Sequence, residues 1–138
     1  MTPIVLDASV TLSWCFADET SDYSERVLDF VRRNEGVVPS LWALEISNVL
    51  LQAEKARRID NNGSLEFLEL LSKLPLRSMN FSIVECLGDI YPLAQRERLT
   101  TYDATYLRLA QIRKCRLATS DDKLRKSAKR CGISTAVE

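Results

Sequence analysis

The stretch PIVLDAS, residues 3–9, decides the fold. A short, partly β-branched apolar run ends on a carboxylate, Asp7, and two small residues follow it. Such a run, bounded by a turn, is typical of a buried strand. An acid that closes a buried strand needs a partner, because an unpaired buried charge is costly. The stretch therefore predicts a core strand with a functional position at its carboxyl end.

The rest of the chain alternates short apolar runs with amphipathic segments. The runs predict further strands at GVVPS (36–40), LRSMN (76–80), CRLAT (115–119) and ISTAV (133–137). Helical periodicity predicts helices over residues 21–33, 40–59, 63–74, 82–98, 99–110 and 122–131. In the fourth helix a kink is expected near Pro92. This alternation predicts an α/β fold, with a mainly parallel sheet sandwiched between helices, in a single domain over residues 1–138.

Composition narrows the chemistry more than it narrows the fold. The chain has 138 residues, of which 46% are hydrophobic and 28% charged, as in ordinary globular domains. Its four cysteines lie far apart and no histidine accompanies them, so reduced thiols are expected rather than a zinc site. The missing histidine also removes the imidazole base of Ser-His and Cys-His mechanisms. Acid–base or metal chemistry must therefore rest mainly on carboxylates.

Hydropathy and charge bear on location and partners. No apolar run approaches the roughly 20 residues of a membrane span, and no basic segment precedes the first apolar run as in a signal peptide. We therefore expect a cytoplasmic protein that does not contact a membrane. Residues 1–95 hold 8 Lys and Arg against 14 Asp and Glu, whereas residues 96–138 hold 11 against 5. The basic last third either steers phosphates or solvates the outer faces of the last helices.

Four acids stand where a parallel sheet gathers its ligands. Asp7 ends the first strand, and Asp121 follows CRLAT. Glu45 and Asp103 lie in the first turns of their predicted helices. Loops at the carboxyl ends of parallel strands share one edge of the sheet, so these acids can lie together. Each also has a simpler interpretation: Asp103 as part of a capping box with Thr100, Asp121 as a helix N-cap, and Glu45 as an exposed helix acid.

Carboxylates that converge on one edge repel one another. Their repulsion raises pKa values and costs stability unless a cation resolves the conflict. Oxygen ligands without histidine or cysteine suit hard cations such as Mg²⁺ or Mn²⁺. A metal-bound water can attack a phosphodiester while the metal stabilises the developing charge. The acid set therefore predicts metal-assisted phosphoryl chemistry.

Four motifs resemble a known family. They are VLDASVTLSWCFADE (5–19), PSLWALEISNVL (39–50), LTTYDATYLRLAQ (99–111) and LATSDDKL (117–124). In that order and at that spacing they resemble the PIN domain, and most closely the VapC ribonuclease toxins of prokaryotic type II toxin–antitoxin pairs. The resemblance covers nearly the whole chain. It implies a metal-dependent endoribonuclease that hydrolyses RNA with Mg²⁺ or Mn²⁺ held by a carboxylate cluster.

The resemblance also assigns residues. The catalytic and metal-binding acids would be Asp7, Glu45, Asp103 and Asp121. The supporting positions would be Ser9, Asn48, Thr119 and Asp122. Ser9 and Thr119 would hydrogen-bond carboxylates and fix their rotamers, the alternative for both being turn chemistry at a strand end. Asp122 directly follows Asp121, and both are candidates for the fourth ligand.

The family's partners and two other functions complete the expectations. The resemblance implies an RNA substrate, a cognate antitoxin protein and a homodimer. Trp14, Phe16 and Trp42 either anchor an antitoxin peptide or belong to the core. One alternative is a non-catalytic PIN-fold binding module. The other is an aspartyl-phosphate phosphatase of haloacid-dehalogenase type, which Ser9 disfavours because it stands where that family needs a second acid.

Overall fold

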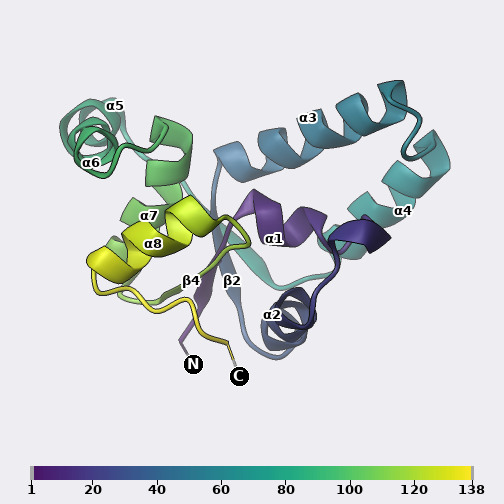
Figure 1. Ribbon diagram of the computed structural model, residues 1–138, viewed down its shortest axis with the longest axis horizontal. Helices are drawn as coiled ribbons and strands as arrows, with labels where there is room; N and C mark the ends of the chain where they lie inside the picture. The colour runs from purple at the N-terminus through teal and green to yellow at the C-terminus, as the bar shows by residue number, and fades with distance from the viewer. Residues whose placement is uncertain (1, 138) are drawn as a thin grey trace.

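The computed structural model describes residues 2–137, and at its centre is a parallel sheet (Figure 1). In the described residues the sheet has four strands in the order β3-β2-β1-β4. The strands are β1 (Ile4–Leu6), β2 (Gly36–Pro39), β3 (Leu76–Met79) and β4 (Arg116–Ala118), and every pairing is parallel. Both β1 and β2 are buried along their whole length. The predicted α/β fold with a parallel sheet is confirmed.

Helices pack on both sides of this sheet (Figure 1). The α-helices are α1 (Ala8–Leu12), α2 (Asp22–Arg33), α3 (Leu41–Lys55), α4 (Asn61–Ser72), α5 (Ile83–Glu85), α6 (Tyr91–Glu97), α7 (Thr101–Arg113) and α8 (Asp122–Arg130). A 3₁₀ turn, η1, spans Ala17–Glu19, and a π-helical turn, η2, spans Cys86–Ile90. All six predicted helices are present, with ends that shift by a few residues. Helices α3 and α4 form an arm that extends away from the sheet (Figure 1).

Helix α7 is the central helix of the core. It packs against β1, β2 and β4, and six of its residues are buried. Its apolar residues Leu107 and Leu109 are fully buried, as are Ile4, Val5 and Leu6 of the central strand. Burying each such side chain contributes about 1.5–3 kcal/mol. This packing fixes the start of α7, and with it Asp103, relative to the carboxyl end of β1.

The prediction of a last strand over residues 133–137 is wrong. One ladder-like hydrogen bond is present, from the Leu117 N–H to the Ser134 carbonyl at 3.1 Å. The Ser134 hydroxyl then accepts from the Ala136 N–H at 3.2 Å, a local turn that competes with strand pairing. The Tyr23 hydroxyl, on α2, donates to the Thr135 carbonyl at 2.8 Å. Side chains, rather than a neighbouring strand, therefore satisfy many of the backbone hydrogen-bonding groups of this segment.

The expected kink near Pro92 takes the form of the π-helical turn η2. Proline lacks an N–H, and its ring clashes with the carbonyl four residues earlier, so a regular α-helix cannot continue through it. The wider turn η2 ends at Ile90, and Pro92 is the second residue of α6. The predicted helix over residues 82–98 is thus a chain of three short helical pieces.

The turn expected after Asp7 is instead a short helix, α1. Asp7 is its N-cap, and the Asp7 carboxylate accepts a hydrogen bond from the Val10 N–H at 3.0 Å. Capping satisfies one of the free N–H groups at the helix start. The acid that closes β1 therefore also begins α1.

Candidate metal centre at the carboxyl edge of the sheet

Asp7 is buried and closely held by hydrogen-bond donors. Its N–H donates to the Ala118 carbonyl at 3.1 Å, which places it beside Thr119 at the end of β4. Its Oδ1 accepts from the Ser9 hydroxyl at 2.7 Å, and its Oδ2 accepts from the Thr119 hydroxyl at 2.5 Å. Only 4% of Asp7 is exposed. Ser9 and Thr119 thus orient the carboxylate, as the sequence predicted.

Thr119 is itself fixed from several sides. Its N–H donates to the Tyr23 hydroxyl at 3.3 Å, and its carbonyl accepts from Arg125 Nη2 at 2.6 Å. Its hydroxyl also accepts from the Asp121 N–H at 3.0 Å. The Arg125 guanidinium lies over the Tyr23 ring, 5.1 Å from its centroid. Sequence reasoning missed Tyr23 and Arg125, because α2 and α8 are about 100 residues apart and no motif links them.

Glu45 reaches the same edge from α3. It is half-buried, and its Oε1 accepts a hydrogen bond of 2.5 Å from the Tyr106 hydroxyl. Tyr106 lies three residues after Asp103 on α7, on the same helix face. Its side chain is only 1% exposed. The sequence motifs gave Tyr106 no role, and its i,i+3 spacing from Asp103 is the signal that could have found it.

Asp103 is the electrostatic centre of the group. It is half-buried, and Thr100 caps α7, with the Thr100 hydroxyl accepting from the Asp103 N–H at 3.1 Å, which is one half of the predicted capping box. Burial raises the pKa of Asp7 to about 6, and the negative charge of Asp103 adds to that rise. Burial likewise raises the pKa of Glu45, again with a contribution from Asp103. Burial and the charge of Asp121 raise the pKa of Asp103.

The two neighbouring acids at the start of α8 differ in their surroundings. Asp121 caps α8, with its Oδ1 accepting from the Leu124 N–H at 3.0 Å. The side chain of Asp122 is 86% exposed and lies 3.7 Å from Arg125 Nη1. Asn48 is also exposed, one turn beyond Glu45 on α3. The charge of Asp103 thus adds to the raised pKa values of Asp7 and Glu45, and the charge of Asp121 adds to that of Asp103, whereas Asp122 and Asn48 are exposed.

The donor set fits a hard divalent cation without forming a closed site. Among residues 2–137, no three acidic, histidine or cysteine side chains stand at the spacing of a ready-made metal site. The charge of one carboxylate affects the pKa of another over a longer distance than separates two ligands of the same metal ion. The acids can therefore influence one another's pKa values without standing at ligand distance. Protein hydroxyls hold two of the acids, Asp7 and Glu45. The donors are oxygens, and burial together with the smaller effect of neighbouring carboxylates raises the pKa values of Asp7, Glu45 and Asp103, a cost that a bound cation would offset.

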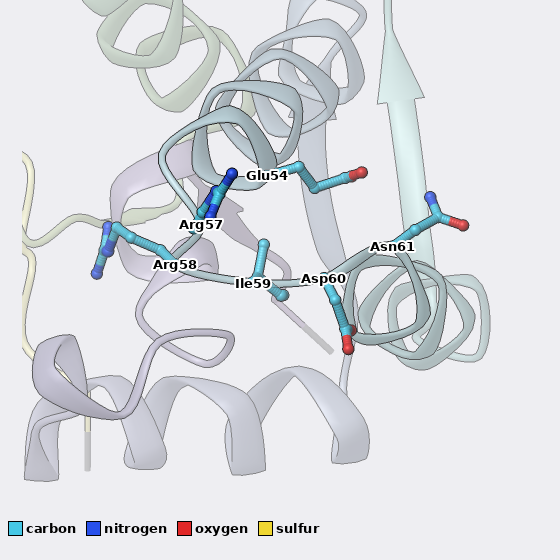
Figure 2. A pocket seen from close by; sticks show the side chains of 6 residues that line it. All are labelled: Glu54, Arg57, Arg58, Ile59, Asp60 and Asn61. Atoms are coloured by element: carbon cyan, nitrogen blue, oxygen red, sulfur yellow. The ribbon is translucent and has the colours of Figure 1, made fainter.

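A cavity of about 420 Å³ lies elsewhere, where α3 passes into α4. It is lined by Glu54, Arg57, Arg58, Ile59, Asp60 and Asn61. Figure 2 shows these side chains pointing away from one another, with Arg58 on one side and Asp60 on another. Arg58 is paired with Asp18 at 3.1 Å and lies over the Phe16 ring. The cavity offers no convergent donors, so it does not compete with the acid cluster.

The large aromatic residues near the N-terminus pack inside the protein. Phe16 and Trp42 are buried. The Trp42 Nε1–H donates to the Thr11 hydroxyl at 3.2 Å, and the Trp14 Nε1–H donates to the Ser24 carbonyl at 2.8 Å. The core interpretation of these side chains is the one that the structure supports.

Comparison with known proteins identifies the family. The sequence model of the PIN domain family matches residues 4–130. The chain belongs to the PIN domain family. Its fold is similar to the crystal structure of PAE2754 from Pyrobaculum aerophilum, with a TM-score of 0.72 and 19% identity over 99% of this chain and 90% of that one. Among the curated proteins, none matches.

The family is typically a nuclease fold that uses divalent metal ions, which makes hydrolysis the expected chemistry of this PIN domain. The haloacid-dehalogenase alternative is not favoured. Within residues 2–137, none of the helices is long and apolar enough to cross a membrane.

The raised pKa values predict how this PIN domain responds to pH and to the loss of one acid. The folded state binds protons on Asp7, Glu45 and Asp103 more tightly than the unfolded chain does. The stability from these groups is therefore present at low pH and lost as pH rises through the folded pKa, about 6 for Asp7. In chelator, the free energy of unfolding should rise as pH falls from about 7 to about 5. Near neutral pH, the free energy of unfolding of Asp103→Asn should equal or exceed that of wild type. It should increase less as pH falls, because one repelling charge is gone.

Urea denaturation at each pH measures this effect, with Asp122→Asn as the matched control. That exposed carboxylate should follow the wild-type curve to within about 0.5 kcal/mol. If the free energy of unfolding of Asp103→Asn in chelator were instead lower by about 1 kcal/mol or more, Asp103 would be a residue that stabilises its helix. That result would contradict the repulsion between the acids.

Proposed function

We propose that this PIN domain is a Mg²⁺- or Mn²⁺-dependent endoribonuclease that acts as the toxin of a type II toxin–antitoxin pair. The single observation that supports it most is the buried Asp7 carboxylate at the end of β1, which the Ser9 and Thr119 hydroxyls hold in place. This carboxylate occurs in a family whose members are typically nucleases. The chain has no histidine, so a carboxylate-held metal is the chemistry that its side chains favour.

In this proposal each residue has a defined part. Asp7, Glu45, Asp103 and Asp121 would hold the cation, which when bound supplies a water of lowered pKa and a counter-charge for the phosphate. Ser9 and Thr119 keep the buried Asp7 carboxylate in one orientation through hydrogen bonds of 2.7 and 2.5 Å. Asn48, which is exposed one turn beyond Glu45 on α3, would contact the substrate at the rim, whereas the exposed Asp122 lies beside Arg125 and would have no direct part.

Basic residues of α8 support an RNA substrate. Burial and the charge of Asp121 raise the pKa of Asp103, and the positive charge of Lys123, an exposed residue of α8, lowers it. Lys126 and Lys129 are exposed on the same helix. Cations beside a metal centre attract the phosphate backbone of a nucleic acid. The preference for RNA follows from the resemblance to ribonuclease toxins.

The central test is cleavage of RNA with and without metal. Cleavage should require Mg²⁺ or Mn²⁺ and stop in chelator, and its products should carry 5′-phosphate and 3′-hydroxyl ends, because water rather than the 2′-hydroxyl attacks. Asp103→Asn should abolish cleavage, whereas Asp122→Asn should retain most of it. End-labelled RNA on a sequencing gel measures both. Full activity in chelator, or cyclic 2′,3′-phosphate ends, would rule out this mechanism, and intact RNA under all conditions would favour the non-catalytic binding module.

An exposed apolar surface supports the proposed homodimer. Its four large side chains lie on consecutive helical pieces, α5, η2 and α6, and each is more than half exposed. They are Ile83 (78%), Val84 (79%), Leu87 (70%) and Tyr91 (56%). Large exposed apolar side chains grouped on one surface mark an interaction site. We propose that a second copy of the chain covers this surface and that a cognate antitoxin binds the assembled toxin.

Sedimentation of the purified chain tests the dimer. Wild type should sediment as a dimer, and Leu87→Ser should shift it towards monomer while the chain stays folded by circular dichroism, because Leu87 is exposed in the single chain. Leu65→Ser on α4, at the other end of the molecule (Figure 1), is the matched control and should remain dimeric. A wild-type chain that is monomeric at micromolar concentration would contradict the proposal.

A further inference from the structure

We infer that Tyr106 is a positioning residue that holds Glu45 in the orientation needed for metal binding. The inference rests on the proposed function, and it adds a residue to the site that neither the motifs nor the family match assigns. The juxtaposition that carries it is the 2.5 Å hydrogen bond from the Tyr106 hydroxyl to Glu45 Oε1, which joins α7 to α3.

The donor in this hydrogen bond is rigid and the acceptor is not. Tyr106 is 1% exposed, and its helix packs against β1 and β2, so the core fixes its ring. Glu45 is half-buried and has three rotatable side-chain bonds, and its neighbours Leu44, Ser47 and Asn48 are exposed. A glutamate at such a boundary has room to turn towards water. The tyrosine hydroxyl keeps its carboxylate at the sheet edge instead.

The hydrogen bond also determines what Glu45 offers to a cation. Its Oε1 already accepts one hydrogen bond from the phenol, so Oε2 keeps more of its lone-pair capacity for a cation. Asp7 is held in the same way by the hydroxyls of Ser9 and Thr119. Tyr106 therefore does for Glu45 what these two residues do for Asp7. Such supporting hydrogen bonds orient metal ligands and contribute to metal affinity.

The spacing of Asp103 and Tyr106 on α7 links metal binding to the positioning of Glu45. Asp103 and Tyr106 are three residues apart and share one face of the helix. One helix thus supplies a proposed ligand of its own and the donor that orients a ligand on α3. This explains why a tyrosine stands at this position in YDATY, where phenylalanine would fill the core equally well.

The test is Mn²⁺ binding to the full-length protein, measured by the loss of the free Mn²⁺ resonance in electron paramagnetic spectra. Tyr106→Phe removes only the hydroxyl and should weaken Mn²⁺ binding about tenfold. Its melting temperature in chelator should stay close to that of wild type, because the ring still fills its place. Tyr102→Phe, on the exposed side of the same helix, is the matched control and should bind Mn²⁺ as wild type does.

A double-mutant cycle shows whether Tyr106 acts through Glu45. In a Glu45→Gln background, adding Tyr106→Phe should cause little further loss of Mn²⁺ affinity. An undiminished further loss, or wild-type affinity in Tyr106→Phe alone, would overturn the inference. If the Phe variant melts early, Mn²⁺ binding of both proteins is measured at a temperature where circular dichroism shows both folded. A wild-type protein that binds no Mn²⁺ would contradict the proposed function, and this inference with it, whereas normal wild-type binding with an unaffected Tyr106→Phe variant would contradict the inference alone.

Discussion

A carboxylate that is 4% exposed at the end of the central strand is the constraint on which the rest of the site depends. Burial raises the pKa of Asp7 to about 6, and three donors oppose that rise: the Thr119 hydroxyl, the Val10 N–H and the Ser9 hydroxyl. The parallel pairing of β1 with β4 brings Thr119 beside Asp7. Tyr23 and Arg125 then fix the backbone of Thr119. The core packing of α7 sets Asp103 against this arrangement, so one buried charge organises side chains from α1, α2, α7 and α8.

Structural and functional interpretations of the acids turn out to be compatible. Asp7 caps α1 and Asp121 caps α8, so the simpler interpretation of Asp121 is correct as far as it goes. A cap uses one carboxylate oxygen, and it holds the side chain at the carboxyl edge of the sheet, where the other acids are. In this fold, capping is a means of positioning the proposed ligands rather than an alternative to it.

The sequence predicted the elements with clear periodicity, and with them the parallel sheet, whereas the shared metal site of Asp7, Glu45, Asp103 and Asp121 stays a prediction. It failed where tertiary contacts outweigh local pattern. Residues 133–137 alternate like a strand, yet side chains of α2 and a local serine turn take their hydrogen bonds. The contrast between Asp121 and the exposed Asp122 depends on the direction in which α8 starts, and adjacent identical residues give no signal of it. Tyr23 and Arg125 were missed because their contacts join distant parts of the chain.

The central claim is that the four acids share one cation, and anomalous diffraction from crystals soaked in Mn²⁺ tests it most directly. The account predicts an anomalous peak bounded by Asp7, Glu45, Asp103 and Asp121, within about 2.5 Å of carboxylate oxygens from at least two of them. The account would be contradicted by a peak found only elsewhere on the protein, or by no peak at a Mn²⁺ concentration that supports RNA cleavage.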